Sequence, residues 1–343
     1  MSLFAQRLID WHRLHGRHDL PWQKTRDPYR VWLSEIMLQQ TQVATVIPYY
    51  ERFLARFPSL ATLAAAPVTA VMENWSGLGY YARARNLHQC AQTVVREHGG
   101  EFPQTPTALE SLPGIGRSTA NAIAAFCFDV RAPILDGNVK RVLCRCYGMT
   151  GFPGSAVTES RLWELAESLL PASEVATYIQ AQMDIGATIC TRSKPRCTAC
   201  PVADLCVAKR EGRVAELPTP KPKKALPERA VTLLVIQSRD QVLLEQRPPV
   251  GIWGGLLSLP ELPEGNDAAA YAAASLGAAI TAVAPAPTFT HVFTHFRLRI
   301  TPLLCVAMPL PGVAAPRLRW ITRETLAQAA LPAPVRKLLS AIP

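Results

Sequence analysis

The sequence predicts two domains, an all-α domain at residues 1–212 and an α/β domain at residues 230–343. Three observations lead to this fold class. Apolar residues recur at helical spacing through the first part, which also holds a glycine hairpin between two predicted helices at 107–126 and a four-cysteine loop at 190–206. A proline-rich basic linker follows at 213–229. Beyond it the pattern changes to short apolar runs that are typical of strands.

The charge of the chain indicates what kind of partner it binds. Its 343 residues carry a formal net charge of +10, which favours nucleic acid over an acidic membrane surface. Charged residues interrupt the N-terminal segment, so no signal peptide is predicted, and the uncharged stretch 268–290 is too weakly apolar for a membrane span. Nine cysteines without a secretory signal indicate a reducing compartment. We therefore expect a cytoplasmic, monomeric protein that does not bind membranes.

Glu35 is the unusual residue of the N-terminal helices. A first amphipathic helix is predicted over Leu3–Leu14, and the apolar spacing that follows predicts a helix up to Pro48 and another beyond it. Glu35 shares a helix face with Val31 and Trp32, so burial should raise its pKa, as a general acid working near neutral pH requires. This segment alone favours a different interpretation, in which Glu35 lies at the edge of the apolar helix face with its carboxylate in water.

The hairpin centres on Gly114 and Gly116. Thr107 and Glu110 predict a capping box at the start of the preceding helix. The two glycines allow a tight turn and the close approach of another backbone, and the helix that follows leaves N–H groups without partners in the chain. Such a terminus can hold a phosphate without reading base sequence. An ordinary turn between packed helices is an equally good interpretation of the hairpin alone.

Asp136 lies 20 residues beyond Gly116, directly before a stripe of apolar residues with helical spacing. It is predicted to be the N-cap of that helix or its immediate neighbour. The helix dipole and the free N–H groups would keep the carboxylate ionised, so that it could stabilise a positive charge developing nearby. Cap and catalyst are compatible roles, although a cap alone would explain an isolated aspartate.

A second Gly-apolar-Gly turn, Gly77–Gly79, precedes Tyr80 and the basic residues Arg83 and Arg85. Aromatic and arginine side chains beside a glycine turn suit contact with DNA bases and phosphates. Half-buried packing is the competing interpretation for the tyrosine, and the basic neighbours slightly favour DNA.

The strongest motif consists of four cysteines with the spacing C-x6-C-x2-C-x5-C. These are Cys190, Cys197, Cys200 and Cys206. A structural zinc usually takes two short pairs and only one is present, so a 4Fe–4S cluster is favoured. The first loop holds Arg192 and Lys194 without any acid, and a cluster would fix this basic loop in a shape that grips phosphate. The remaining cysteines are predicted to pack in the core: Cys90, Cys127, Cys144, Cys146 and Cys305.

The second domain is predicted from strands and a closing helix. The strands are expected at 231–237, 241–247, 289–300 and 303–308, and the helix at 334–342. Gly255 and Glu261 match the start of the phosphohydrolase box of the Nudix family, but Ala268–Ala274 stand where its acidic helix should follow. Without a carboxylate cluster there is no Mg²⁺ site to activate water. We expect this domain to bind a ligand rather than hydrolyse one.

Taken together, these motifs resemble the adenine DNA glycosylases of the MutY type, a family of helix–hairpin–helix glycosylases. The resemblance spans nearly the whole chain and rests on five features in the family's order: VWLSEIMLQQTQV, GLGYYARARNL, LPGIGRSTA with Asp136, the four-cysteine loop, and the linker with its Nudix-like tail. Sister enzymes such as endonuclease III lack that tail. The resemblance implies base excision repair, with a 4Fe–4S cofactor. The DNA substrate and the missing targeting signals then predict a place at the nucleoid, and the alanine-rich composition suits a bacterium. The substrate would be adenine mispaired with 8-oxoguanine or guanine in duplex DNA.

The family's catalytic roles fall on Glu35, Asp136 and Asn138. By resemblance, Glu35 would protonate adenine at N7 and later help to activate water, Asp136 would stabilise the oxocarbenium-like sugar, and Asn138 would be a further polar group of the active site. Adenine must first be flipped out of the stack, at a cost of roughly a few kcal/mol that the mispair lessens. Gln39 and Tyr80 would enter the duplex and fill the space around the lesion.

The resemblance also implies DNA contacts elsewhere. The backbone from Gly114 to Gly116, next to Ser118, would clamp the phosphate beyond the lesion. Phe293, Thr294 and His295 match a Phe-Ser-His loop that contacts 8-oxoguanine. Threonine keeps the hydroxyl and adds a methyl group that this contact must accommodate.

Ser118 indicates what the enzyme should not do. Bifunctional relatives of the endonuclease III type carry a lysine at this position, which forms a Schiff base with the sugar and then cleaves the strand. Serine cannot do this, so we expect a monofunctional glycosylase with water as nucleophile, although Lys140 could trap a little product.

Two alternatives stay open. One is a related glycosylase that removes thymine or uracil from mismatches, which would normally lack the Nudix-like tail. The other is a non-catalytic iron–sulfur protein that binds DNA, against which the joint presence of Glu35 and Asp136 counts.

Overall fold

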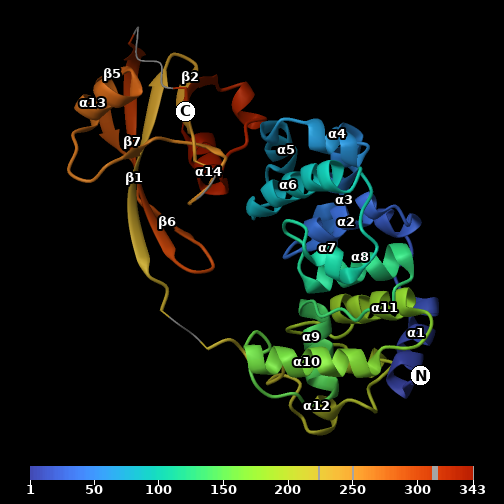
Figure 1. The fold of residues 1–343 in the computed structure, drawn as a ribbon. Coiled ribbons are helices and arrows are strands. Elements are labelled where there is room, and N and C mark those ends of the chain that lie inside the picture. Colours follow the sequence, from blue (N-terminus) through green and yellow to red (C-terminus); the bar gives the residue numbers. More distant parts are fainter. Residues whose placement is uncertain (223–224, 249–250, 311–315, 343) are drawn as a thin grey trace. The chain divides into compact units, whose positions relative to one another are not determined.

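A computed structural model describes residues 1–222, 225–248, 251–310 and 316–342 (Figure 1). The predicted fold class, a helical domain followed by an α/β domain, is confirmed. Residues 223 and 224 of the predicted linker lie outside the described residues.

The chain packs into two compact units. Unit 1 consists of Met1–Ala65 and Asn86–Lys223, and unit 2 consists of Ala66–Arg85 and Lys224–Pro343. The short segment 66–85 therefore groups with the C-terminal residues, which no sequence pattern indicates.

Unit 1 is built of helices. They are α1 (Leu3–His15), η1 (Pro21–Lys24), α2 (Pro28–Leu38), α3 (Val43–Arg56), α4 (Leu60–Ala65), α6 (Ala82–Glu97, which starts in unit 2), α7 (Pro106–Glu110), α8 (Arg117–Phe128), α9 (Gly137–Cys146), α10 (Ala156–Leu169), α11 (Val175–Thr188), η2 (Cys197–Ala199) and α12 (Val207–Arg210). Among the described residues, no helix combines the length and the apolar character that crossing a membrane would need.

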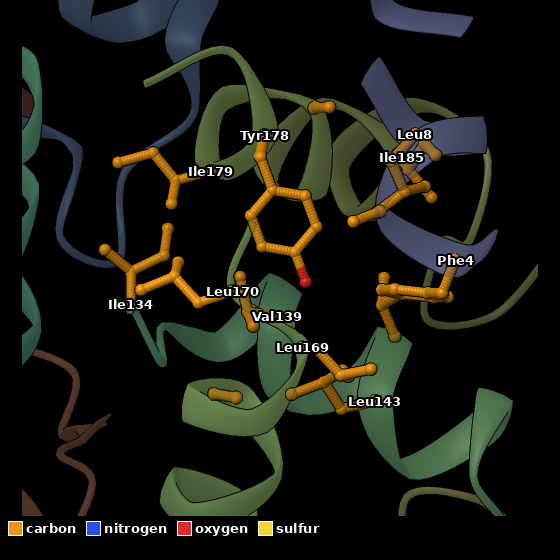
Figure 2. Close-up of a cluster of buried hydrophobic side chains, with 14 of the residues drawn as sticks. Phe4, Leu8, Ile134, Val139, Leu143, Leu169, Leu170, Tyr178, Ile179 and Ile185 are labelled. Atoms are coloured by element: carbon orange, nitrogen blue, oxygen red, sulfur yellow. The ribbon is translucent and has the colours of Figure 1, made fainter. Parts of the chain in front are cut away.

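The apolar face of α9 lies in a buried cluster with α1, α10 and α11 (Figure 2). Val139 and Leu143 of α9, Leu8 of α1 and Ile185 of α11 have no exposed surface, and Tyr178 of α11 is 1% exposed. Burying one large apolar side chain contributes roughly 1.5–3 kcal/mol. The apolar stripe predicted after Asp136 is thus the inward face of α9, and its burial fixes where both ends of that helix lie.

The break between α2 and α3 differs from the sequence prediction. The spacing predicts a helix up to Pro48, but α2 ends at Leu38, α3 begins at Val43, and Pro48 lies inside α3. Between the two helices the backbone passes through Gln40 at a φ of 57°. Periodicity misses this break because apolar residues keep helical spacing on both sides of it.

The predicted capping box at Thr107 and Glu110 is also wrong. Helix α7 begins at Pro106, and the cap is Thr105, whose hydroxyl accepts a hydrogen bond from the N–H of Ala108 at 3.4 Å. Proline suits the first helical position because its φ is fixed and it has no N–H to satisfy. The cap therefore falls directly before the proline.

Unit 2 contains one eight-stranded sheet among its described residues. The strands are β1 (Glu228–Ser238), β2 (Gln241–Gln246), β3 (Leu257–Ser258), β4 (Glu261–Leu262), β5 (Ala278–Pro285), β6 (Phe289–Val292), β7 (Arg297–Pro309) and β8 (Leu318–Thr322). The order is β3-β2-β1-β7-β5, with β4 paired to β1, β6 to β7 and β8 to β2. The helical segments are α5 (Val68–Trp75), α13 (Ala268–Tyr271), η3 (Ala272–Leu276), η4 (Thr325–Ala327) and α14 (Ala333–Ala341).

The parallel pair β1 and β7 forms the centre of the sheet. Leu233 and Val235 point to the face covered by α14, whereas Leu234 and Ile236 point to the face covered by α13 and η3. All four are fully buried. A strand buried on both faces reads as a continuous apolar run, which is the pattern that 231–237 shows in the sequence.

Asp184 of α11 carries a buried charge that binds Arg17, in the segment that follows α1. The carboxylate has no exposed surface and accepts hydrogen bonds from the N–H of Arg17 at 2.7 Å, from its guanidinium at 2.6 and 2.9 Å, and from Gln180 at 2.9 Å. The Nε2 atom of His12 lies 3.4 Å away. Burial alone would raise the pKa of Asp184, but the hydrogen bonds from His12 and Arg17 outweigh it and hold the pKa below its usual value.

We expect Asp184→Asn to destabilise the fold by about 3 kcal/mol, because it leaves the Arg17 guanidinium without its charged partner. A depressed carboxyl pKa stabilises the folded state above the unfolded pKa and ceases to do so as the pH falls through the folded pKa. The difference between wild type and variant should therefore be largest near pH 7 and shrink in acid. Urea unfolding at several pH values measures it. Asp129→Asn, which breaks only the exposed pair with Arg26, is the control and should have a much smaller effect.

Candidate active site

A cleft of about 1200 Å³ in unit 1 brings all three predicted catalytic residues together. It lies between the end of α2, the start of α8, the start of α9 and the end of α11. The predicted site residues that line it are Glu35, Gln39, Ser118, Asp136, Asn138 and Arg192. Those that do not line it are Gly114, Gly116, Lys194 and the four cysteines Cys190, Cys197, Cys200 and Cys206 in unit 1, and Tyr80, Phe293, Thr294 and His295 in unit 2.

Glu35 is held half-buried on α2, among side chains that point into the core. Burial raises the pKa of its carboxyl to about 7, and the negative charge of Asp136 adds to this. The raised pKa is what the apolar helix face predicts. At neutral pH the group is poised between a proton donor and a base.

Asp136 is the N-cap of α9, as predicted. Its carboxylate accepts a hydrogen bond from the N–H of Val139 at 2.7 Å, and the amide nitrogen of Asn138 lies 3.3 Å from its other oxygen. Burial raises the pKa of Asp136 above its usual value, and the hydrogen bonds from Val139 and Asn138 and the positive charge of Arg141 offset part of that rise. The sequence reveals the bonds that favour the ionised form but not the burial that works against them.

Ser118 holds the backbone that leads to Asp136. Its hydroxyl accepts a hydrogen bond from the N–H of Leu135 at 3.0 Å. Three residues further along α8, Asn121 donates to the carbonyl of Pro133 at 2.6 Å. Helix α8 therefore fixes the path of the segment that leads to Asp136, a role that the sequence does not show for Ser118.

Arg141 connects the active site with the cysteine loop. Its guanidinium donates to the side-chain oxygen of Asn138 at 2.8 Å, to the carbonyl of Gly186 at 2.7 Å and to the carbonyl of Cys190 at 2.7 Å. One arginine therefore orients the Asn138 amide, the end of α11 and the first predicted cluster ligand. Sequence reasoning missed it because an arginine on a helix is usually a solvated side chain.

Arg145, one turn further along α9, organises the cysteine loop from within. It is only 3% exposed and donates to the carbonyls of Leu217, Thr191 and Arg192 at 2.8, 2.7 and 3.1 Å. A further contact of 3.4 Å joins it to the sulfur of Cys190. Arg141 and Arg145 are four residues apart, which places both side chains on one face of the helix. This spacing is the sequence pattern from which their shared role could have been predicted.

The four predicted ligands Cys190, Cys197, Cys200 and Cys206 line one small apolar pocket together with Val142 and Ile185. Nowhere in the described part of the chain is a group of three or more His, Cys, Asp or Glu side chains placed to hold a metal ion. Four thiols spread around a pocket, with Arg145 beside them, fit a 4Fe–4S cluster better than a single zinc ion. Of the five other cysteines, only Cys127 is half-buried and the rest are buried, as predicted.

The two glycines of the hairpin have different roles. Gly114 has a φ of 77°, and a Cβ atom there would lie 2.6 Å from the Cβ of Asn86 on α6. Gly114 is therefore needed for packing, as the plain-turn interpretation requires. Gly116 is the N-cap of α8, and a Cβ atom on it would meet nothing within 4 Å. The space in front of Gly116 and the first turn of α8 is therefore open.

The predicted recognition loop of unit 2 is an aromatic corner between β6 and β7. Phe293 stacks on Phe296 with ring centroids 4.4 Å apart, and the hydroxyl of Thr294 lies 3.3 Å from Nδ1 of His295. The Nudix-type residue Glu261 forms an ion pair with Arg247 at 2.9 Å.

Family comparisons match three parts of the chain. Residues 33–168 match the HhH-GPD superfamily of base excision DNA repair proteins, 190–206 match the iron-sulfur binding domain of endonuclease III, and 231–341 match a NUDIX domain. The four cysteines are thus the iron–sulfur motif of endonuclease III, whose cofactor is a 4Fe–4S cluster.

Similar proteins span almost the whole chain. The adenine DNA glycosylase of Buchnera aphidicola subsp. Acyrthosiphon pisum is 36% identical over 98% of this chain and 97% of its own. Those of Rattus norvegicus and Homo sapiens are 34% and 31% identical over 98% of this chain and 77% and 73% of theirs.

Among solved structures, a thermostable thymine-DNA glycosylase is similar with a TM-score of 0.56 and 29% identity, covering 61% of this chain and 96% of that one. A non-covalent endonuclease III–DNA complex has a TM-score of 0.53 at 22% identity, with coverage of 61% and 94%, and shows the fold alone.

We expect Glu35→Gln to stabilise the protein in alkali. The pKa of Glu35 is about 7 in the folded protein against an ordinary 4.5, so ionising it disfavours the folded state. This cost is absent below about pH 4.5, complete above about pH 7, and removed by glutamine. Chemical unfolding at about pH 8 should show the variant more stable by up to roughly 3 kcal/mol, with no difference at about pH 4.5.

The exposed glutamate Glu51 provides the matched control, because Glu51→Gln should change stability little at either pH. A Glu35→Gln variant that is no more stable than wild type at pH 8 would show that the carboxyl is solvated in the folded protein.

Proposed function

Because the chain belongs to the adenine DNA glycosylase family, we propose that it releases adenine mispaired with 8-oxoguanine or guanine in duplex DNA. Base excision by hydrolysis of an N-glycosidic bond is the activity of that family. The observation that carries the proposal is the pair of carboxyls, Glu35 and Asp136, which line one cleft in different surroundings. Burial raises the pKa of both, to about 7 for Glu35, but only Asp136 receives hydrogen bonds and a positive charge that favour its ionised form and offset part of the rise.

Glu35 acts as the general acid in this proposal. Adenine is a poor leaving group unless a ring nitrogen is protonated as the bond breaks, and N7 is the nitrogen that the family resemblance assigns to Glu35. A carboxyl with a pKa of about 7 keeps a large protonated fraction at neutral pH. After the base departs, the same group is a carboxylate that can take a proton from the attacking water.

Asp136 stabilises the sugar in this proposal. Loss of adenine leaves an oxocarbenium-like ring, and a carboxylate fixed in the cleft offsets that positive charge. The bond from the N–H of Val139 holds the carboxylate in place, and Arg141 orients Asn138 beside it. Asn138 then fixes the second oxygen and offers its polar side chain to the sugar or to the water.

The DNA contacts surround this chemistry. Gly116 and the first turn of α8 take the phosphate beyond the lesion, and Arg192 and Lys194 take the backbone from the cysteine loop. Cys190, Cys197, Cys200 and Cys206 would hold the cluster, which when bound fixes the shape of that loop. Gln39 and Tyr80 fill the space that the flipped adenine leaves.

Recognition of the opposite base falls to unit 2. Phe293, Thr294 and His295 supply an aromatic face, a hydroxyl and an imidazole, which suit stacking and hydrogen bonding to 8-oxoguanine. Within unit 2, the Nudix-type Glu261 is occupied by Arg247, and Ala268–Ala274 offer no carboxylate. A binding role therefore suits this domain. The enzyme acts as a monomer in this proposal.

Glu35→Gln should lower single-turnover adenine release from A:8-oxoG duplexes by roughly a hundredfold or more, because an amide cannot donate the proton. The wild-type rate should fall as the pH rises through about 7, where Glu35 loses its proton. Release should be faster from A:8-oxoG and A:G than from T:G or uracil-containing duplexes.

Glu51→Gln serves as the control and should keep the wild-type rate. Unchanged adenine release by Glu35→Gln would rule out Glu35 as the general acid. Faster release of thymine or uracil would favour the mismatch glycosylase that the similar thymine-DNA glycosylase structure suggests.

The DNA strand should stay intact after base release. Ser118 offers no amine, and the amine of Lys140 is paired with Glu159 at 2.7 Å. Gels run with and without alkali should therefore show strand breaks only after alkali, with at most a trace of borohydride-trapped complex. Robust β-elimination without alkali or heat would contradict the monofunctional assignment.

A further inference from the structure

The turn that carries Tyr80 is fastened, within unit 2, to the C-terminal part of the chain. The hydroxyl of Tyr81 donates to the carbonyl of Leu331 at 3.3 Å and accepts from the N–H of Gly77 at 3.2 Å. A single oxygen atom thus joins the first residue of the turn to the segment that precedes α14.

Two arginines strengthen this attachment. Arg85 donates to the carbonyl of Gly254 at 2.5 Å. From the other side, Arg336 of α14 donates to the hydroxyl of Ser76 at 3.0 Å and to the carbonyl of Ala329 at 2.6 Å. Arg336 thus holds the turn before its glycines, at Ser76. Tyr81 binds the first glycine, and Arg85 holds the chain after them.

The turn needs such support because its backbone is unfavourable. Tyr80 has a φ of 49°, a region that bulky side chains rarely occupy, and it follows Gly79 at 76°. Strain of this kind persists only where the surroundings impose it. Arg83 supplies part of that constraint through bonds to the carbonyls of Leu78 and Gly79 at 3.3 and 3.1 Å. Tyr80 itself is 48% exposed and available to DNA.

The same attachment leads to the recognition loop. Gly254, whose carbonyl Arg85 holds, follows Trp253, which has a φ of 56°. The Trp253 ring lies 6.3 Å from the ring of Phe293, the first residue of the recognition loop. Contacts therefore run without a gap from Phe293 through Trp253 and Arg85 to the turn that carries Tyr80.

We propose that these contacts couple two events energetically: the fit of Phe293–His295 to the base opposite adenine, and the entry of Tyr80 into the duplex. Tyr81 and Arg85 are then positioning residues that set specificity through Tyr80 without touching the reacting atoms. The inference rests on the proposed function, since it takes the roles of Tyr80 and of the recognition loop from there. Spatial continuity is not coupling, and only non-additive effects of paired substitutions establish it.

The test is a double-mutant cycle on the full-length chain with its cluster. Single-turnover adenine release is measured on A:8-oxoG and A:G duplexes for wild type, Tyr81→Phe, His295→Ala and the double variant. Each single change should lower the preference for A:8-oxoG about fivefold, the effect expected for one neutral hydrogen bond. The double variant should fall no further than about the larger single effect.

A fluorescent base beside the mispair gives a second readout. Its signal on binding reports insertion of Tyr80 and should drop in Tyr81→Phe even where the melting temperature is unchanged. Tyr271→Phe is the matched control, because Tyr271 packs on the opposite face of the sheet and should change neither readout.

The outcomes separate this inference from the proposed function. If His295→Ala lowers the preference and Tyr81→Phe does not, or if the two effects multiply, the coupling is wrong and the function stands. If wild type shows no preference for A:8-oxoG, or His295→Ala leaves it unchanged, the assigned role of the loop fails and the coupling fails with it. Should Tyr81→Phe fold poorly, Ser76→Ala removes the acceptor that Arg336 finds at the turn and tests the same attachment.

Discussion

Burial of one face of α9 is the constraint on which the geometry of unit 1 depends. Val139 and Leu143 anchor the helix in the core, so its two ends have fixed positions. The N-terminal end presents Asp136 to the cleft, and the C-terminal half sends Arg145 into the cysteine loop. A helix with a loosely packed core face would misplace Asp136 and the iron–sulfur loop together. The position of both therefore depends on the packing of one helix.

The cleft separates two identical functional groups by their surroundings. Glu35 has burial and a neighbouring negative charge, both of which favour its protonated form. Asp136 is also removed from water, but it receives hydrogen bonds from the start of α9 and the positive charge of Arg141. Two carboxyls in one cavity would otherwise compete for the same protonation state. Placing one on an apolar helix face and the other at a helix N-terminus gives the two carboxyls different electrostatic surroundings.

The sequence predicts what depends on local pattern. The cap at Asp136, the inward stripe after it, the cysteine spacing and the strand at 231–237 all follow from neighbouring residues. Contacts between distant segments have no such signal. Arg141 and Arg145 belong to a type that is normally exposed, and the grouping of 66–85 with the C-terminal residues arises only from tertiary packing. The misplaced cap at Thr107 shows a different limit, since Thr105 followed by Pro106 offered a better start just before it.

The hydrogen bond between Ser118 and the backbone N–H of Leu135 bears on how such enzymes diverge. A lysine ammonium has no acceptor, so exchanging the serine for a lysine installs a nucleophile and at once releases the segment that aims Asp136. Such an exchange would therefore also need another acceptor for the N–H of Leu135. The side chain at position 118 thus affects the alignment of Asp136 as well as the supply of an amine.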